Sequence, residues 1–318
     1  MTGADKFSPR VSIIVPVYNG SDYLYESLTG ALSQTYRNYE VIVVNDGSDD
    51  GGRTERIAKL FGDRIRYYEK PNGGVSSALN YGIERMSGEY FSWLSHDDNY
   101  TPEKIEASVE AIRKTGKSDA GIIAFTDGYY INSRSEKIRD FPVKFKTDRI
   151  YSGKQVLAAM LEKGTLNGNC MLIPKSAFEK CGLFDESLKY NQDALMWYKI
   201  FCAGYRLVCD GRKNVMYRLH SEQTSVKKSN LLAKDSLALA GKILPAFSEI
   251  SDKEFNPVYL LAVRYARLSC KEAVRECLKY GIANGNLTDV QVMKIKALEK
   301  AGLLLNFGRR IYRRTVRR

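Results

Sequence analysis

The sequence has few of the residues that build disulfide-stapled or zinc-binding proteins. It contains 6 cysteines and 2 histidines among 318 residues, with no C-x-x-C spacing and no Cys/His cluster. This scatter argues against a disulfide framework or a zinc site and predicts reduced, packed thiols. No apolar run reaches the roughly 18 residues of a membrane-spanning helix, and the first ten residues lack the apolar stretch of a signal peptide. We therefore expect a cytoplasmic protein.

The length and the composition are those of an ordinary globular protein. Hydrophobic residues make up 44% of the chain and aromatic residues 11%, which excludes collagen-like and disordered chains. At roughly 150 residues per domain the chain holds one large domain or two. Strand patterns fade after Thr224, and the remainder is mostly helical in pattern. We place a domain boundary near Lys228, between regions 1–228 and 229–318.

Positive charge is concentrated in the second region. The formal net charge is +12, and residues 229–318 carry 17 Lys/Arg and 8 Asp/Glu, or +9 of it. The last ten residues, Arg309–Arg318, hold three arginine pairs, and Leu304, Phe307 and Ile311 follow one another at helical spacing. Such a segment favours an anionic surface, for example a membrane face. One alternative function is therefore an anionic-surface binding protein, for membrane or nucleic acid, without enzymatic activity.

The first region alternates short β-branched runs with helical patterns, which is typical of an α/β protein with a mainly parallel sheet. The predicted strands are Val11 to Val17, Glu40 to Val44, Ile65 to Glu69 and Tyr90 to Leu94. The Thr101-Pro102 pair predicts a helix start with Thr101 as the N-cap. From Gly121 onward the runs are shorter and indicate mixed or antiparallel strands.

Polar residues follow three of the predicted strands. They are Pro16-Val17-Tyr18-Asn19, Asn45-Asp46-Gly47-Ser48 and Ser95-His96-Asp97-Asp98. Ligands of open α/β sheets bind beyond the carboxyl ends of the strands, so these three segments are candidates for one site. Complete P-loop and G-x-G-x-x-G dinucleotide motifs are absent, which argues against those nucleotide sites.

These segments, in their order, resemble a known family. The resemblance also covers Gln34-Thr35-Tyr36, Asn72-Gly-Gly-Val-Ser76, Gly168-Asn-Cys-Met171, Cys181-Gly-Leu-Phe-Asp-Glu186, Asn191-Gln-Asp193 and Tyr217-Arg-Leu-His220. Together, over about residues 9 to 226, they are similar to inverting glycosyltransferases of family two with the GT-A fold, of the bacterial surface-polysaccharide type. The resemblance implies that residues 1–228 are the catalytic domain and 229–318 a helical C-terminal region outside the family match.

The resemblance implies a divalent metal, Mn²⁺ or Mg²⁺, which would neutralise the diphosphate of a sugar nucleotide as it leaves. By similarity Asp98 and His220 would bind the metal, and Asp97 would contact the donor. Ser95 stands where the family usually has a further aspartate, which puts one ribose or metal contact in doubt. For His96 a ligand role and a packing role stay open.

The resemblance also implies the nucleotide contacts. Asp46 would accept the N3 hydrogen of a uracil or thymine ring, which favours UDP or dTDP donors. Tyr18 offers a ring face to the base, Gly74 lies in a stretch whose backbone amides could contact sugar or phosphate, and the remaining nucleotide-binding candidates are Pro16, Val17 and Asn19.

Asp193 stands at the position of the family's catalytic aspartate. As general base it would take the proton from the acceptor hydroxyl during inversion at the anomeric carbon. A helix N-cap is the structural alternative for the same residue.

The expected partners are a nucleotide-sugar donor and a saccharide or lipid-linked saccharide acceptor. The arginine tail predicts peripheral attachment to the inner face of the plasma membrane through Arg309–Arg318. We expect no nucleic acid partner, and a homodimer through the helical region is a further possibility.

Overall fold

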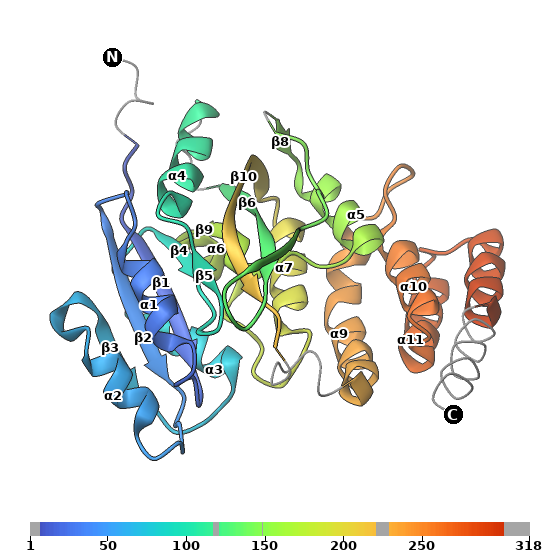
Figure 1. Cartoon of the computed structure of the whole chain (residues 1–318). Helices are drawn as coiled ribbons and strands as arrows, with labels where there is room; N and C mark the ends of the chain where they lie inside the picture. The colour runs from blue at the N-terminus through green and yellow to red at the C-terminus, as the bar shows by residue number, and fades with distance from the viewer. Residues whose placement is uncertain (1–6, 117–120, 148, 221–228, 302–318) are drawn as a thin grey trace. The chain divides into compact units, whose positions relative to one another are not determined.

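The computed structural model describes residues 7–116, 121–147, 149–220 and 229–301. The chain divides into two compact units (Figure 1). The first comprises Met1–Val156 and Leu166–Lys227, and the second comprises Leu157–Thr165 and Lys228–Arg318. The proposed tail segment Arg309–Arg318 and its flanking apolar residues lie outside the described residues.

The first unit is built on one mixed sheet. Its strand order is β3-β2-β1-β4-β9-β6-β10-β5, with β7 paired to β6 and β8 paired to β10. The strands are β1 (Val11–Val17), β2 (Tyr39–Asn45), β3 (Arg66–Glu69), β4 (Tyr90–Trp93), β5 (Asn99–Tyr100), β6 (Ile122–Ile131), β7 (Lys137–Asp140), β8 (Ile150–Tyr151), β9 (Met171–Pro174) and β10 (Arg206–Arg218).

The first four strands run parallel, as the alternating pattern predicts. All seven residues of β1 are buried, and β1 pairs in parallel with β2 on one side and β4 on the other. A strand that is covered on both faces needs apolar side chains in both directions, which explains its nearly unbroken Val/Ile run. The fold class predicted from the sequence, a mainly parallel sheet with flanking helices, is confirmed.

Helices connect and cover the strands of this unit. They are α1 (Leu24–Leu32), α2 (Arg53–Lys59), α3 (Val75–Arg85), α4 (Lys104–Lys114), α6 (Lys175–Cys181) and α7 (Gln192–Cys202), with 3-10 turns η2 (Gly62–Arg64) and η3 (Gly168–Cys170). A further helix, α5 (Gly153–Lys163), begins in this unit and belongs to the second unit from Leu157 onward. The prediction of Thr101 as the N-cap of α4 is wrong, because the helix begins later and Glu103 is its N-cap. Thr101 instead donates its hydroxyl to Oδ1 of Asn214 at 3.0 Å, next to the short strand β5.

The second half of the sheet departs from the sequence pattern. The two predicted runs around Phe125 and Tyr129 form one strand, β6, which continues through the buried Asp127. The neighbouring β10 is 13 residues long and carries register shifts between Cys209 and Val215.

The second unit is helical where it is described. Its helices include α9 (Ser229–Glu249), α10 (Pro257–Arg267) and α11 (Lys271–Ala283). Asn256 caps α10 by accepting the backbone N–H of Tyr259, and Pro257 occupies the first helical position, where a missing N–H costs nothing. Among the described residues no helix is long and apolar enough to cross a membrane.

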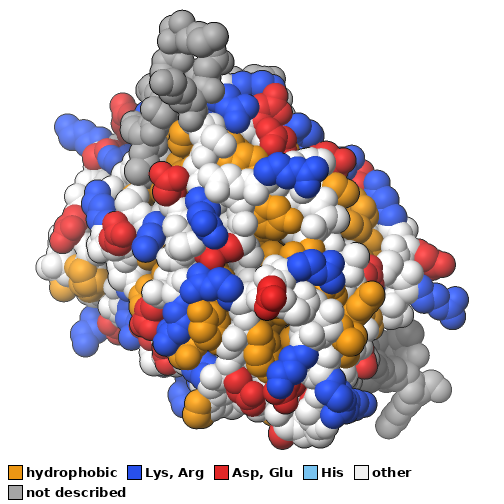
Figure 2. Space-filling view, turned by 90° about the vertical axis from the view of Figure 1, so that its left-hand side faces the viewer, with side chains coloured by type: hydrophobic (Ala, Val, Ile, Leu, Met, Phe, Trp, Pro, Cys, Tyr) orange, Lys and Arg blue, Asp and Glu red, His pale blue; other side chains and the backbone are white. Residues whose placement is uncertain are grey.

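One face of the molecule illustrates the balanced charge of the first region. Residues 1–228 carry 32 Lys/Arg and 29 Asp/Glu. On the face shown in Figure 2, basic and acidic side chains are interspersed with apolar ones.

Candidate active site

The three polar segments predicted from the sequence lie at one edge of the sheet. Val17 is paired with Asn45 at the end of β1 and β2, and Ile14 is paired with Trp93 at the end of β4. Because these strands are parallel, the residues that follow them leave the sheet on the same side. The structure therefore brings together the loops that contain Tyr18, Asp46 and Asp97.

Asp97 and His220 face each other across this edge. Nε2 of His220 lies 3.0 Å from Oδ2 of Asp97, and the two side chains keep 14% and 18% of their surface exposed. The ring of Tyr23 contacts the His220 imidazole, with a centroid distance of 5.2 Å. The pair is thus a carboxylate and an imidazole that are held together and still open to solvent.

Asp98 lies deeper than Asp97 and has both carboxylate oxygens engaged. Its side chain accepts the backbone N–H of Arg218 at 2.8 Å on Oδ1 and the side-chain amide of Asn169 on Oδ2. The residue is 2% exposed. Burial, with the neighbouring Asp97 charge as a second cause, holds the pKa of Asp98 well above the ordinary aspartate value. Asn169 occurs in a stretch that resembles the family, but its contact with Asp98 had no signal in the sequence.

His96 packs against the loop that follows β1. Its Cδ2 would lie 2.5 Å from a Cβ placed on Gly20, so the ring fills the space that this glycine leaves. Burial lowers the pKa of His96, and a backbone hydrogen bond at Pro16 partly opposes that shift. The geometry favours the packing role left open by the sequence.

The loop after β1 is held by a polar network and presents an open ring. Asn19 adopts a left-handed conformation with φ of 50° and donates its side-chain amide to Oδ1 of Asp49 at 2.6 Å. The Tyr18 hydroxyl donates to the same oxygen at 3.2 Å, and the Tyr18 residue is 44% exposed. Pro16 and Val17 end the strand and fix where this loop leaves the sheet.

Asp46 is buried and clamps the turn that precedes α3. Oδ1 accepts Nζ of Lys70 at 2.7 Å, and the carboxylate also accepts the backbone N–H groups of Gly73 and Gly74, the latter at 2.7 Å. The amide N–H of Gly74, expected near sugar or phosphate, is therefore directed at Asp46. The prediction did not include Lys70; its place directly after β3 at the same sheet edge is a signal that could have identified it.

Asp193 lies in the first turn of α7 rather than at its cap. The N-cap is Asn191, so the structural alternative in which Asp193 caps the helix is wrong. Its Oδ1 accepts the backbone N–H of the next residue, Ala194, at 2.6 Å. Burial raises the pKa of Asp193 to about 6, although the hydrogen bond from Ala194 opposes the shift. A carboxylate with such a pKa is half protonated near pH 6 and mostly ionised at pH 7.

Among the described residues, no group of three or more His, Cys, Asp or Glu side chains could hold a metal ion. The Asp97–His220 pair supplies two donors of the kind that divalent cations accept, a carboxylate oxygen and an imidazole nitrogen. Among the described His, Cys, Asp and Glu side chains, this pair offers two ligands and no third.

The comparisons with known proteins agree with this architecture. The family described as Glycosyl transferase family 2 matches residues 12–182, more than half of the chain. An uncharacterized glycosyltransferase of Rickettsia bellii is 40% identical over 281 residues, which cover 87% of this chain and 39% of the relative, so the chain spans well under half of that protein.

Two solved structures share the fold at low sequence identity. S. aureus TarS 1-349 in complex with UDP-GlcNAc superposes with a TM-score of 0.66 at 16% identity, over 92% of this chain and 89% of the other. The mannosyltransferase PcManGT of Pyrobaculum calidifontis, in complex with GDP-Man and Mn²⁺, gives 0.52 at 20% identity, over 95% and 81%.

The fold and the family match together define a glycosyltransferase with the GT-A architecture. The chain belongs to glycosyl transferase family 2, which confirms the resemblance drawn from the sequence motifs.

Proposed function

We propose that residues 1–228 are the catalytic domain of an inverting, metal-assisted glycosyltransferase with Asp193 as its general base. The observation that carries the proposal is the half-buried Asp193 carboxylate in the first turn of α7, whose pKa of about 6 suits a base that must be ionised yet still basic near pH 7. In an inverting transfer, Asp193 takes the proton of the acceptor hydroxyl while the nucleotide leaves from the opposite face of the sugar.

We assign the metal to Asp97 and His220, with Asp98 behind them. Two neighbouring ligands of an octahedral Mg²⁺ or Mn²⁺, each about 2.1 Å from the ion, lie about 3.0 Å apart, which matches the Asp97–His220 separation of 3.0 Å. Both oxygens of Asp98 already accept a hydrogen bond, from Asn169 and from the backbone N–H of Arg218, so Asp97 is the more accessible carboxylate of the two. When bound, the metal supplies positive charge to the departing diphosphate.

We propose that the donor is a UDP or dTDP sugar. Asp46 is the one acidic group of the nucleotide candidates that is buried, and its hydrogen bond to Lys70 sets an acceptor and a cation side by side. That pair is complementary to the N3 hydrogen and the adjacent carbonyl oxygens of uracil or thymine, whereas cytosine offers no N3 hydrogen. The exposed Tyr18 ring supports stacking on the base. The UDP-GlcNAc in the TarS complex is consistent with this choice.

We propose that the acceptor is a hydroxyl of a saccharide or lipid-linked saccharide. This rests on the family membership and on the resemblance to surface-polysaccharide enzymes. Membrane attachment through Arg309–Arg318 remains part of the same proposal.

Isothermal titration calorimetry tests the donor site. We would titrate UDP, dTDP, GDP and CDP with Mn²⁺ or with EDTA into the wild type, Asp97→Ala, Asp98→Ala and the control Asp63→Ala, which removes an exposed carboxylate. We expect Mn²⁺-dependent binding of UDP or dTDP that Asp97→Ala loses and Asp63→Ala keeps.

Two other results would change the proposal. If Asp98→Ala lost the metal dependence and Asp97→Ala kept it, the ligand assignment would be reversed. If no nucleotide bound the wild type under any condition, the donor-site proposal would be abandoned.

A further inference from the structure

Arg218 is a buried cation that holds several elements around the candidate active site. The residue is 1% exposed. Its Nη2 donates to Oε2 of Glu26 on α1 at 2.8 Å, and its Nη1 donates to Oγ of Ser135 at 2.9 Å and to the backbone oxygen of Asn132 at 3.2 Å. The guanidinium therefore ties the end of β10 to α1 and to the turn between β6 and β7.

The same guanidinium contacts both members of the Asp97–His220 pair, one directly and one through a ring. Its Nε donates to the backbone oxygen of Asp97 at 2.8 Å. The guanidinium carbon of Arg218 also lies over the face of the Tyr23 ring, 4.4 Å from its centroid. The Tyr23 ring in turn packs against the imidazole of His220. Moving Arg218 would displace the backbone of one proposed ligand and the packing surface of the other.

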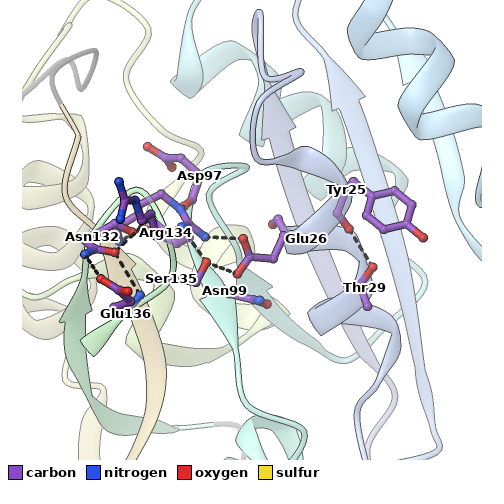
Figure 3. Close-up of polar contacts among 12 residues, drawn as sticks. Tyr25, Glu26, Thr29, Asp97, Asn99, Asn132, Arg134, Ser135 and Glu136 are labelled. Atoms are coloured by element: carbon purple, nitrogen blue, oxygen red, sulfur yellow. Dashed lines mark hydrogen bonds and ion pairs between the residues drawn. The ribbon is translucent and has the colours of Figure 1, made fainter. Parts of the chain in front are cut away.

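Ser135 connects this group to the turn at a conformational cost. Its φ of 65° lies in the left-handed region, where glycine would be relaxed and a serine is strained. Its hydroxyl donates to Oε1 of Glu26 at 2.7 Å and accepts Nη1 of Arg218, so it bridges the ion pair. Figure 3 shows Ser135 and Glu26 facing each other, with Asp97 close by. A glycine would relieve the strain but would remove the bridge.

The turn itself is held independently of Ser135's hydroxyl. Oδ1 of Asn132 accepts the backbone N–H groups of Arg134 and Glu136 at 2.9 and 3.0 Å, and its side-chain amide donates to Oε2 of Glu136 at 2.7 Å. A change confined to the Ser135 side chain therefore leaves the turn closed. This separates the role of the hydroxyl from the stability of the turn.

We infer that Ser135, Glu26 and Arg218 are positioning residues for the Asp97–His220 pair. The inference rests on the proposed function, because it assumes that this pair holds the metal. Partners outside the metal ligands that fix their orientation commonly change metal affinity by about 10- to 100-fold when removed. The Arg218–Glu26 ion pair joins a buried guanidinium to a carboxylate that is 39% exposed, and such a pair is a weak source of stability, so its geometric effect on Asp97 is the better account.

The decisive variant is Ser135→Gly. We would measure Mn²⁺ affinity in the presence of UDP by calorimetry, together with the thermal unfolding midpoint. We expect Mn²⁺ affinity to fall by about threefold, less than the roughly tenfold typical of a direct partner of a ligand, because Ser135 acts on Asp97 through Arg218. The unfolding midpoint should stay level or rise, because the strained φ is relieved. Ser133→Gly, an exposed serine of the same turn, is the matched control and should leave both unchanged.

Two further measurements keep the test sharp. Ser135→Ala, which removes the hydroxyl and keeps a side chain at the same φ, should weaken Mn²⁺ binding by a similar factor. The chain has only two histidines, so the imidazole NMR signals can be assigned by His96→Asn, and addition of Mg²⁺ should shift the His220 signal less in Ser135→Gly than in the wild type.

The outcomes separate the two proposals. Wild-type Mn²⁺ affinity in both Ser135 variants would overturn the positioning inference and leave the metal site standing. A wild type that binds UDP but no Mn²⁺ would overturn the metal assignment, and the inference with it.

Discussion

Lys104, the first residue of α4, is fully buried against β4 and β9, and replacing it should stabilise the protein. Its Nζ donates to Oγ of Ser92 at 2.5 Å and to the backbone oxygen of Met171 at 3.3 Å, and it lies 4.6 Å from the centroid of the Tyr100 ring. Both hydrogen-bond partners of Nζ are therefore uncharged groups, a hydroxyl and a backbone oxygen. Burial lowers the pKa of Lys104 from 10.5 to about 7.

The magnitude follows from the pKa difference. Because the folded pKa is the lower one, the folded state binds Lys104's proton less tightly than the unfolded chain does, and stability rises as the pH goes from about 7 to 10.5. A shift of this size corresponds to about 3 to 5 kcal/mol, present as a penalty below pH 7. Lys104→Met removes the penalty but also the hydrogen bonds to Ser92 and Met171, which cost about 1 to 2 kcal/mol.

We therefore expect Lys104→Met to be about 2 to 3 kcal/mol more stable than the wild type at pH 6, with the difference vanishing near pH 10. Urea unfolding followed by tryptophan fluorescence measures this, because both tryptophans, Trp93 and Trp197, belong to the first unit with Lys104. Other titrating groups cancel in the difference between the two proteins. Stability curves that run parallel from pH 6 to 10 would refute the reasoning.

Two further predictions concern carboxylates. If Asp193 is the base, kcat/KM should fall tenfold per pH unit below the Asp193 pKa of about 6, and Asp193→Asn should lower turnover of a sugar nucleotide by about 100- to 10,000-fold while UDP still binds in a calorimeter. Burial raises the pKa of Glu40, but hydrogen bonds from Ser12, Arg66 and Ser87 outweigh it and bring the value to about 2. The stabilisation by ionised Glu40 is therefore present above pH 4.5 and is lost as the pH falls toward 2. In Glu40→Gln, the loss of unfolding free energy between pH 4.5 and 2 should be about 3 kcal/mol smaller than in the wild type. An equal loss in both proteins would contradict this.

The parallel half of the fold was predictable because its strands are buried on both faces. Val11–Val17 was predicted with the bounds it has, and the loops that follow the strands were grouped correctly at one edge. In the other half the signal fails for a physical reason. β10 includes Asp210, Gly211 and Arg212, whose polarity reads as a turn, and the strand tolerates them at a bulge where its register shifts.

The site was predictable in its residues more than in their roles. Asp97 and Asp98 are neighbours in sequence, so no pattern tells which one faces solvent. Asp98 is the one turned inward because it is hydrogen-bonded to Asn169 and to the backbone N–H of Arg218. These partners lie 71 and 120 positions from it in the sequence. The clamp of Lys70 on Asp46 is a tertiary contact of the same kind.

The interleaving of the two units restricts how this chain can be divided or recombined. The helical unit includes three buried residues of α5, namely Leu157, Met160 and Leu161, although about seventy residues of sequence separate them from the rest of that unit. One link between the two parts is Arg264 of α10, which donates to the backbone oxygen of Met160 at 3.5 Å. A cut at 228 would separate these three residues from the remainder of their own unit. An exchange of the helical region between related enzymes, in the laboratory or in evolution, must therefore carry Leu157–Thr165 with it.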